Sequence, residues 1–151
     1  MVLTASQAKA IQGNWTKIAA NAQDMGNELF IRYLNQNSGD QDVFLKFDDV
    51  PLDQLKGNAA FNAQTKLVID ALGRIVGSLD NIQSAASSLR ERVRTHQPRG
   101  IHIAQFERLL DLMPMFVQEK ADASGAIADA WRILIADLMP AMRDEYARLS
   151  R

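Results

Sequence analysis

Apolar side chains recur every three or four residues along almost the whole chain, and this spacing restricts the fold more than any other feature. The clearest case is residues 55–79, where Phe61, Val68, Leu72 and Ile75 would share one face of a helix. No useful length of sequence alternates apolar with polar residues, as a half-buried strand would. The sequence therefore predicts an all-α fold.

The same spacing predicts seven or eight helices in a single domain over residues 1–151. Thr4 and Gln7 have the separation of a capping box at the start of the first helix. Pro114 and Pro140 fall inside the last two helices, and we expect each proline to kink its helix rather than end it. The expected helices are 4–20, 22–35, 55–79, 84–96, 103–119 and 126–149, with a polar turn over 35–42 and an irregular segment over 44–53.

The composition excludes several classes of protein. The chain has 151 residues, of which 47% are apolar and 23% charged, as in an ordinary soluble domain with a substantial core. No apolar run is long enough to span a bilayer, and the N-terminus lacks the pattern of a secretory signal. The net charge of −1 without a basic block argues against nucleic acid as a partner, and the lack of cysteine excludes thiolate catalysis. We therefore expect a cytoplasmic protein that binds neither nucleic acid nor a membrane.

One of only two histidines, His96, closes an expected helix immediately before Gln97 and Pro98. Because a proline ends a helix within a residue or two, His96 is expected in the final turn. A histidine at this position is more often a solvated residue that stabilises the helix end. In a chain without cysteine, it is also one of very few good ligands for a transition metal. The position of His96 alone leaves both interpretations open.

From Trp15 onward, the chain resembles the globin family over essentially its whole length. The resemblance lies in the order and lengths of the helices and in the spacing between Phe44 and His96. Globins bind a haem between two helices and hold its iron through a proximal histidine. The resemblance implies a globin fold around a haem pocket, a non-covalently bound haem b, and His96 as the sole protein ligand of the iron. The carbonyl of Arg92 and the hydroxyl of Thr95 are expected to orient the other ring nitrogen.

The resemblance also assigns roles around the haem. Phe44 is expected to press on the porphyrin face, with Phe47 packed beneath it. Gln64 takes the distal position, where many globins carry histidine, and its amide can donate a hydrogen bond to bound dioxygen. Val68 would lie over the iron and control the access of ligands to it, while Phe30 would make the distal pocket more apolar and crowded.

Further residues are expected at the edges of the pocket. Ile101 follows the proximal histidine after a short corner and is expected to contact the haem. Arg99, Lys46 and Lys66 are candidates for pairing with the haem propionates, although exposed ion pairs contribute little energy.

Gly26 and Thr65 fall where the second helix and the distal helix cross in the family. This contact favours small residues. Since Thr65 is larger than the glycine often found there, we expect the crossing to be slightly wider.

The resemblance implies reversible binding of dioxygen and other diatomic ligands by five-coordinate ferrous iron, with oxygen storage or transport as the function and no enzymatic role. Gln64 does not titrate near neutrality, which disfavours peroxidase chemistry. Gln64 is also a poor iron ligand, and His102 lies beyond the corner. The alternatives are a haem enzyme or sensor acting on nitric oxide, nitrite or peroxide, and a helical interaction module without haem. A homo-oligomer is compatible with the sequence.

Overall fold

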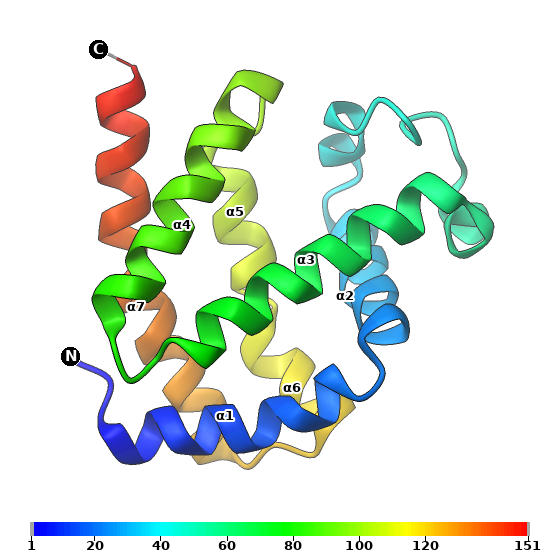
Figure 1. Ribbon diagram of the computed structural model, residues 1–151. Helices are drawn as coiled ribbons and strands as arrows, with labels where there is room; N and C mark the ends of the chain where they lie inside the picture. The colour runs from blue at the N-terminus through cyan, green and yellow to red at the C-terminus, as the bar shows by residue number, and fades with distance from the viewer. Residues whose placement is uncertain (1, 151) are drawn as a thin grey trace.

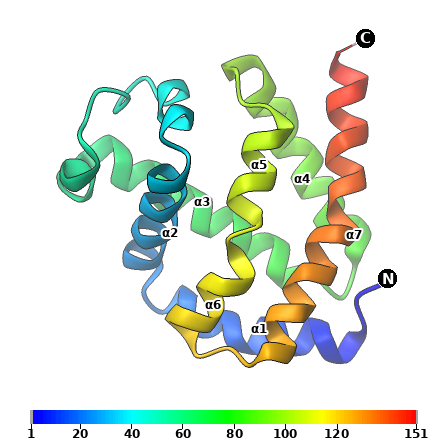
Figure 2. The same ribbon diagram turned by 180° about the vertical axis from the view of Figure 1, so that it is seen from behind.

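The computed structural model describes residues 2–150, which form seven α-helices and three short 3-10 helices and contain no strand (Figures 1 and 2). The α-helices are α1 (Ala5–Ala19), α2 (Ala22–Gln36), α3 (Ala59–Gly77), α4 (Ile82–His96), α5 (Ile103–Leu110), α6 (Met113–Ala121) and α7 (Gly125–Leu149). The 3-10 helices are η1 (Ser38–Val43), η2 (Leu52–Gly57) and η3 (Gln97–Arg99). The predicted all-α class is confirmed. Over residues 2–150, none of the helices is long and apolar enough to cross a membrane.

Short polar side chains determine where several helices begin. The side chains of Thr4, Asn58, Asn81 and Ser124 each accept a hydrogen bond from the backbone N–H three residues further along. These bonds satisfy donors that have no partner inside the helix. The capping box predicted for Thr4 and Gln7 is present, with both of its reciprocal hydrogen bonds.

Two of the predicted helices are interrupted. The segment predicted as one helix over 55–79 is divided into η2 and α3, because Asn58 is extended and caps α3. The segment predicted as one kinked helix over 103–119 is divided into α5 and α6, so the prediction for Pro114 is wrong. Pro114 lies in the first turn of α6, where a backbone N–H has no helical partner to lose. Pro140 does lie inside a continuous helix, α7, as predicted.

The buried apolar side chains form two clusters. The larger cluster joins α1, α3, α4, α6 and α7, and includes Trp15 and Trp131, whose ring centroids lie 6.0 Å apart. The smaller cluster joins α2 to η2 and the start of α3, and is rich in phenylalanine. The partly buried Val68 and Leu109 pack against both clusters, and both line the cavity described below. In Figure 1, α3 crosses the front of the molecule from η2 towards α4, and α4 packs along α7.

The backbones of α2 and α3 come into close contact where the helices cross. A Cβ atom added to Gly26 would lie 2.7 Å from the carbonyl oxygen of Thr65 and 2.9 Å from Cγ1 of Ile69. The side chain of Thr65 is fully buried and donates a hydrogen bond to Asn27. The expectation of a wider crossing was therefore wrong, because the larger side chain does not hold the two backbones apart.

We expect Gly26→Ala to lower the free energy of unfolding by about 1–3 kcal/mol, since the added methyl group overlaps backbone atoms that cannot turn away. Urea unfolding followed by circular dichroism measures this change. Gly13→Ala in α1 is the matched control, because its Cβ would meet nothing within 4 Å. That variant should be more stable by about 0.5–1 kcal/mol through the higher helix propensity of alanine. Equal effects of the two substitutions would contradict the close crossing.

Candidate functional site

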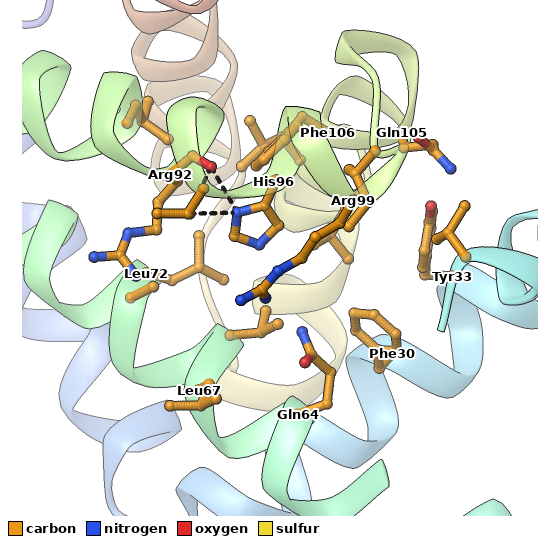
Figure 3. A pocket seen from close by; sticks show the side chains of 18 of the residues that line it. Phe30, Tyr33, Gln64, Leu67, Leu72, Arg92, His96, Arg99, Gln105 and Phe106 are labelled. Atoms are coloured by element: carbon orange, nitrogen blue, oxygen red, sulfur yellow. Dashed lines mark hydrogen bonds between the residues drawn. The ribbon is translucent and has the colours of Figure 1, made fainter. Parts of the chain in front are cut away.

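A cavity of about 360 Å³ is lined by side chains of α2, α3, α4 and α5, by the corner after α4, and by Val43 and Phe44 at the end of η1 (Figure 3). Most of the residues predicted for the pocket line this cavity, namely Phe30, Phe44, Gln64, Val68, His96, Arg99 and Ile101; Phe47, Lys46 and Lys66 do not. Phe47 lies behind Phe44 instead, with the two rings stacked at a centroid distance of 5.3 Å. Phe47 is buried in the smaller apolar cluster, where it supports Phe44 from outside the cavity.

His96 occupies the last turn of α4, as predicted, and its ring is held on two sides. Its Nδ1 lies 2.6 Å from the carbonyl oxygen of Arg92 and 3.0 Å from the hydroxyl of Thr95. Because a carbonyl oxygen can only accept, this short contact places the proton on Nδ1 and leaves the Nε2 lone pair free. Phe106 packs edge-on against the ring at a centroid distance of 5.3 Å. In Figure 3 the second ring nitrogen faces the interior of the cavity, on the side of Gln64.

The environment of His96 favours a neutral imidazole. Burial of the ring lowers the pKa of His96 below its ordinary value, and this effect exceeds the opposing effect of the hydrogen bond to Arg92. A neutral imidazole with a free nitrogen is the form of histidine that binds a metal. The geometry of His96 therefore suits a metal ligand better than a solvated helix end.

Contacts with α7 fix the end of α4 and the corner that follows it. Arg94 donates a hydrogen bond of 2.8 Å to Glu145, and the hydroxyl of Tyr146 donates one of 2.6 Å to the carbonyl oxygen of Ile101. Arg148 and Arg94 together hold the pKa of Glu145 at about 2, so the carboxylate is charged at neutral pH. Gly100 adopts a left-handed conformation with φ of 80°, which a side chain would disfavour, and so turns the chain towards α5.

Gln64, Val68 and Phe30 form the wall of the cavity opposite His96. Figure 3 shows the amide of Gln64 directed into the cavity below the imidazole. Phe30 is buried and packs edge-on against Phe44 at a centroid distance of 5.3 Å. Within residues 2–150 the Gln64 amide has no hydrogen-bond partner, so its N–H groups face a space that an acceptor can enter.

Three arginines, Arg74, Arg92 and Arg99, line the cavity, and no acidic residue within 2–150 lines it. The sequence predicts Arg99 as a cation of the pocket, but it does not predict Arg74 or the side chain of Arg92 there. Arg92 lies one helical turn before His96, and this spacing could have indicated the shared face. The other predicted cations lie outside the cavity: Lys66 pairs with Asp70 on the surface at 2.7 Å, and Lys46 is exposed.

The residues of this cavity fit a haem. His96 offers one unprotonated nitrogen, the walls are largely apolar, and the arginines carry charge that suits the two carboxylates of a porphyrin. Leu67 lines the cavity and yet leaves 61% of its surface exposed. A planar apolar group in the cavity would cover this surface.

The family model of the globins, described as Globin, matches residues 27–142. The chain is 28% identical over 131 residues to a globin of Nerita albicilla, which covers 85% of this chain and 83% of that protein. Its fold is similar to that of the haemoglobin from the botfly Gasterophilus intestinalis, with a TM-score of 0.85, 18% identity and coverage of 95% and 99% of the two chains. It is also similar to a hexacoordinated heme protein of an anhydrobiotic tardigrade, with a TM-score of 0.86, 22% identity and coverage of 96% of each chain.

The match to the family model and the identity to a known globin agree with the helix order and the cavity. The resemblance expected from Phe44 and His96 is thereby confirmed, and with it the binding of haem that characterises the family. We conclude that this chain belongs to the globin family.

Proposed function

We propose that the cavity binds haem b without a covalent link, with His96 as the only protein ligand of the iron, and that the protein stores or carries dioxygen in the cytoplasm. The observation that carries this proposal is the free Nε2 of His96, which faces the Gln64 amide across an apolar cavity. When bound, the haem supplies the iron centre at which dioxygen and other diatomic molecules are taken up.

The residues around the proximal side orient the ligand. The hydrogen bond from Nδ1 of His96 to Arg92 fixes the tautomer and the plane of the ring, and makes Nε2 a better donor to iron. Phe44, which is backed by Phe47, would pack on the porphyrin face. Arg99 lines the cavity near His96 and would pair with a propionate of the haem.

The distal residues set how the ligand is held. The Gln64 amide would donate a hydrogen bond to a ligand that carries partial negative charge in the cavity. Val68 and Phe30 fill the remaining space with apolar atoms and exclude water. Because the amide of Gln64 does not titrate near neutral pH, the distal side of the cavity does not provide the acid–base group that peroxide cleavage requires. Oxygen storage or transport is therefore the function that these residues support best.

We expect the deoxygenated ferrous protein at neutral pH to have a five-coordinate, high-spin absorption spectrum and to bind dioxygen reversibly. Gln64 is a weak ligand for iron, and the exposed His102 at the start of α5 does not line the cavity. Addition of excess imidazole is the control, since it should produce a low-spin spectrum. A low-spin spectrum without added imidazole would contradict the proposal and place this protein with hexacoordinated heme proteins such as that of the tardigrade.

A further inference from the structure

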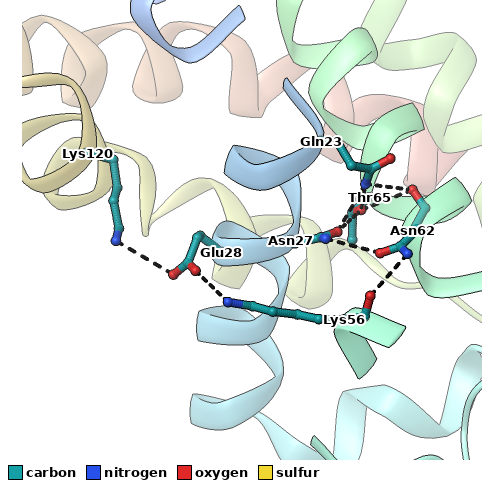
Figure 4. Close-up of polar contacts among 7 residues, drawn as sticks. All are labelled: Gln23, Asn27, Glu28, Lys56, Asn62, Thr65 and Lys120. Carbon is teal, nitrogen blue, oxygen red and sulfur yellow. Dashed lines mark hydrogen bonds and ion pairs between the residues drawn. The ribbon is translucent and has the colours of Figure 1, made fainter. Parts of the chain in front are cut away.

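We infer that Thr65, together with Gln23, Asn27 and Asn62, positions the distal amide of Gln64 and thereby sets how long dioxygen stays bound. This inference rests on the proposed function. We call these four residues the polar cluster; it lies between α2 and α3, outside the cavity (Figure 4). Thr65 is a positioning residue in this scheme, because it does not itself line the cavity.

Hydrogen bonds connect the four side chains into one network. The side-chain nitrogen of Gln23 contacts the hydroxyl of Thr65 at 2.9 Å, Oδ1 of Asn27 at 3.1 Å and the carbonyl oxygen of Asn62 at 3.0 Å. The Thr65 hydroxyl donates to Oδ1 of Asn27 at 2.5 Å. Asn27 donates to Oδ1 of Asn62 at 3.1 Å, and Asn62 donates in turn to the carbonyl oxygen of Lys56 at 3.1 Å. The network therefore ties α3 to both α2 and η2.

The central members of the network are removed from water. Thr65 is fully buried, and Asn27 leaves only 8% of its surface exposed. Buried polar groups that lose a partner lose much more free energy than exposed ones do, so the network strongly favours one arrangement of the two helices. The nearby ion pairs of Glu28 with Lys56 and Lys120 are exposed and contribute far less.

The network acts at the point where α2 and α3 touch. Gly26 allows the close backbone contact with Thr65, but this contact by itself does not specify the rotation of α3 about its axis. The hydroxyl of Thr65 can meet both Gln23 and Asn27 in only one rotation of α3 about its axis. The polar cluster thus supplies the rotational constraint that a glycine contact lacks.

A small rotation of α3 about its axis moves the end of the Gln64 side chain by a distance that matters for a hydrogen bond. Side-chain ends lie about 5–6 Å from a helix axis, so a roll of about 10° moves them by about 1 Å. A displacement of that size takes a hydrogen bond out of its range of distances. Gln64 precedes Thr65 directly. Within the described residues its amide has no hydrogen-bond partner that would hold it in place if α3 rotated.

The test replaces Thr65 with valine, which keeps the shape and removes the hydroxyl, in the haem-loaded protein. We expect dioxygen to dissociate roughly three- to ten-fold faster, carbon monoxide to dissociate at nearly the same rate, and the infrared stretching band of bound carbon monoxide to shift. Amide hydrogen exchange should become faster over 59–70 of α3. Thr65→Ser should restore all these properties, and Gln23→Met, at a half-exposed position, should reproduce the valine effect if the valine variant folds poorly.

Two comparisons make the result decisive. Asp70→Asn breaks an exposed ion pair on α3 that does not reach α2, and should change none of these measurements. In a Gln64→Leu background, Thr65→Val should have no further effect on dioxygen dissociation. A Thr65→Val effect of the same size in that background, or unchanged dissociation and exchange in the single variant, would overturn the inference. Failure of the proposed role of Gln64 would appear separately, as unchanged dioxygen dissociation in Gln64→Leu both alone and together with Phe30→Leu, and would overturn the inference as well.

Discussion

We expect His96→Ala to abolish stable haem retention. The substitution removes Nε2 of His96, the one α4 nitrogen with a free lone pair that faces the cavity. The apolar walls and the arginines that line the cavity stay in place. Those walls should still bind haem weakly, but the haem should pass rapidly to an acceptor apoprotein. Added imidazole should enter the vacated space and restore a haem spectrum like that of the unaltered protein.

His102→Ala is the matched control for this experiment, because His102 is the other histidine of the chain, is exposed and lies outside the cavity. It should retain haem as firmly as the unaltered protein. Tight haem binding by His96→Ala without imidazole, or loss of haem from His102→Ala, would refute the assignment of the iron ligand.

The second large effect is expected for Gln64→Leu. A buried hydrogen bond to a partly charged ligand is worth about 1.5–3 kcal/mol, so dioxygen should dissociate roughly ten- to a hundred-fold faster. Carbon monoxide gathers much less negative charge and should dissociate at nearly the same rate. Stopped-flow displacement of each ligand from the ferrous protein measures both rates.

Phe30 complicates this comparison, since its bulk beside Phe44 also slows the escape of a ligand. The Gln64→Leu substitution should therefore be repeated with Phe30→Leu. Unchanged dioxygen dissociation in both backgrounds would show that the amide does not contact the ligand.

The sequence predicted the parts of the site that local patterns determine. His96 could be placed because Pro98 ends its helix and because histidine is rare in this chain. The spacing of four residues indicated that Gln64 and Val68 share a helix face, but their distal position depended on the resemblance to the globins. Phe30 and Phe44 depended on the resemblance to the globins, since their meeting is a long-range contact that no local spacing specifies.

The errors have physical causes as well. Pro114 is compatible with both a kink and a helix start, and the apolar spacing continues through the break between α5 and α6. The width of the α2–α3 crossing depends on where the Thr65 side chain turns, and its partner Gln23 lies 42 residues away. Such a pairing is fixed only when the helices have docked.

The segment η1 contributes Val43 to the cavity wall but is held there by few buried contacts. It buries none of its residues, unlike α3 and α4, whose inner faces are buried. Its main anchor is Asp40, which accepts hydrogen bonds of 2.6 Å from Tyr33 and 2.8 and 2.9 Å from Arg108. A segment with few buried apolar contacts unfolds locally at a lower free energy than the core does. Loss of the Asp40 contacts with Tyr33 and Arg108 should therefore lower the free energy of local opening at this edge of the cavity.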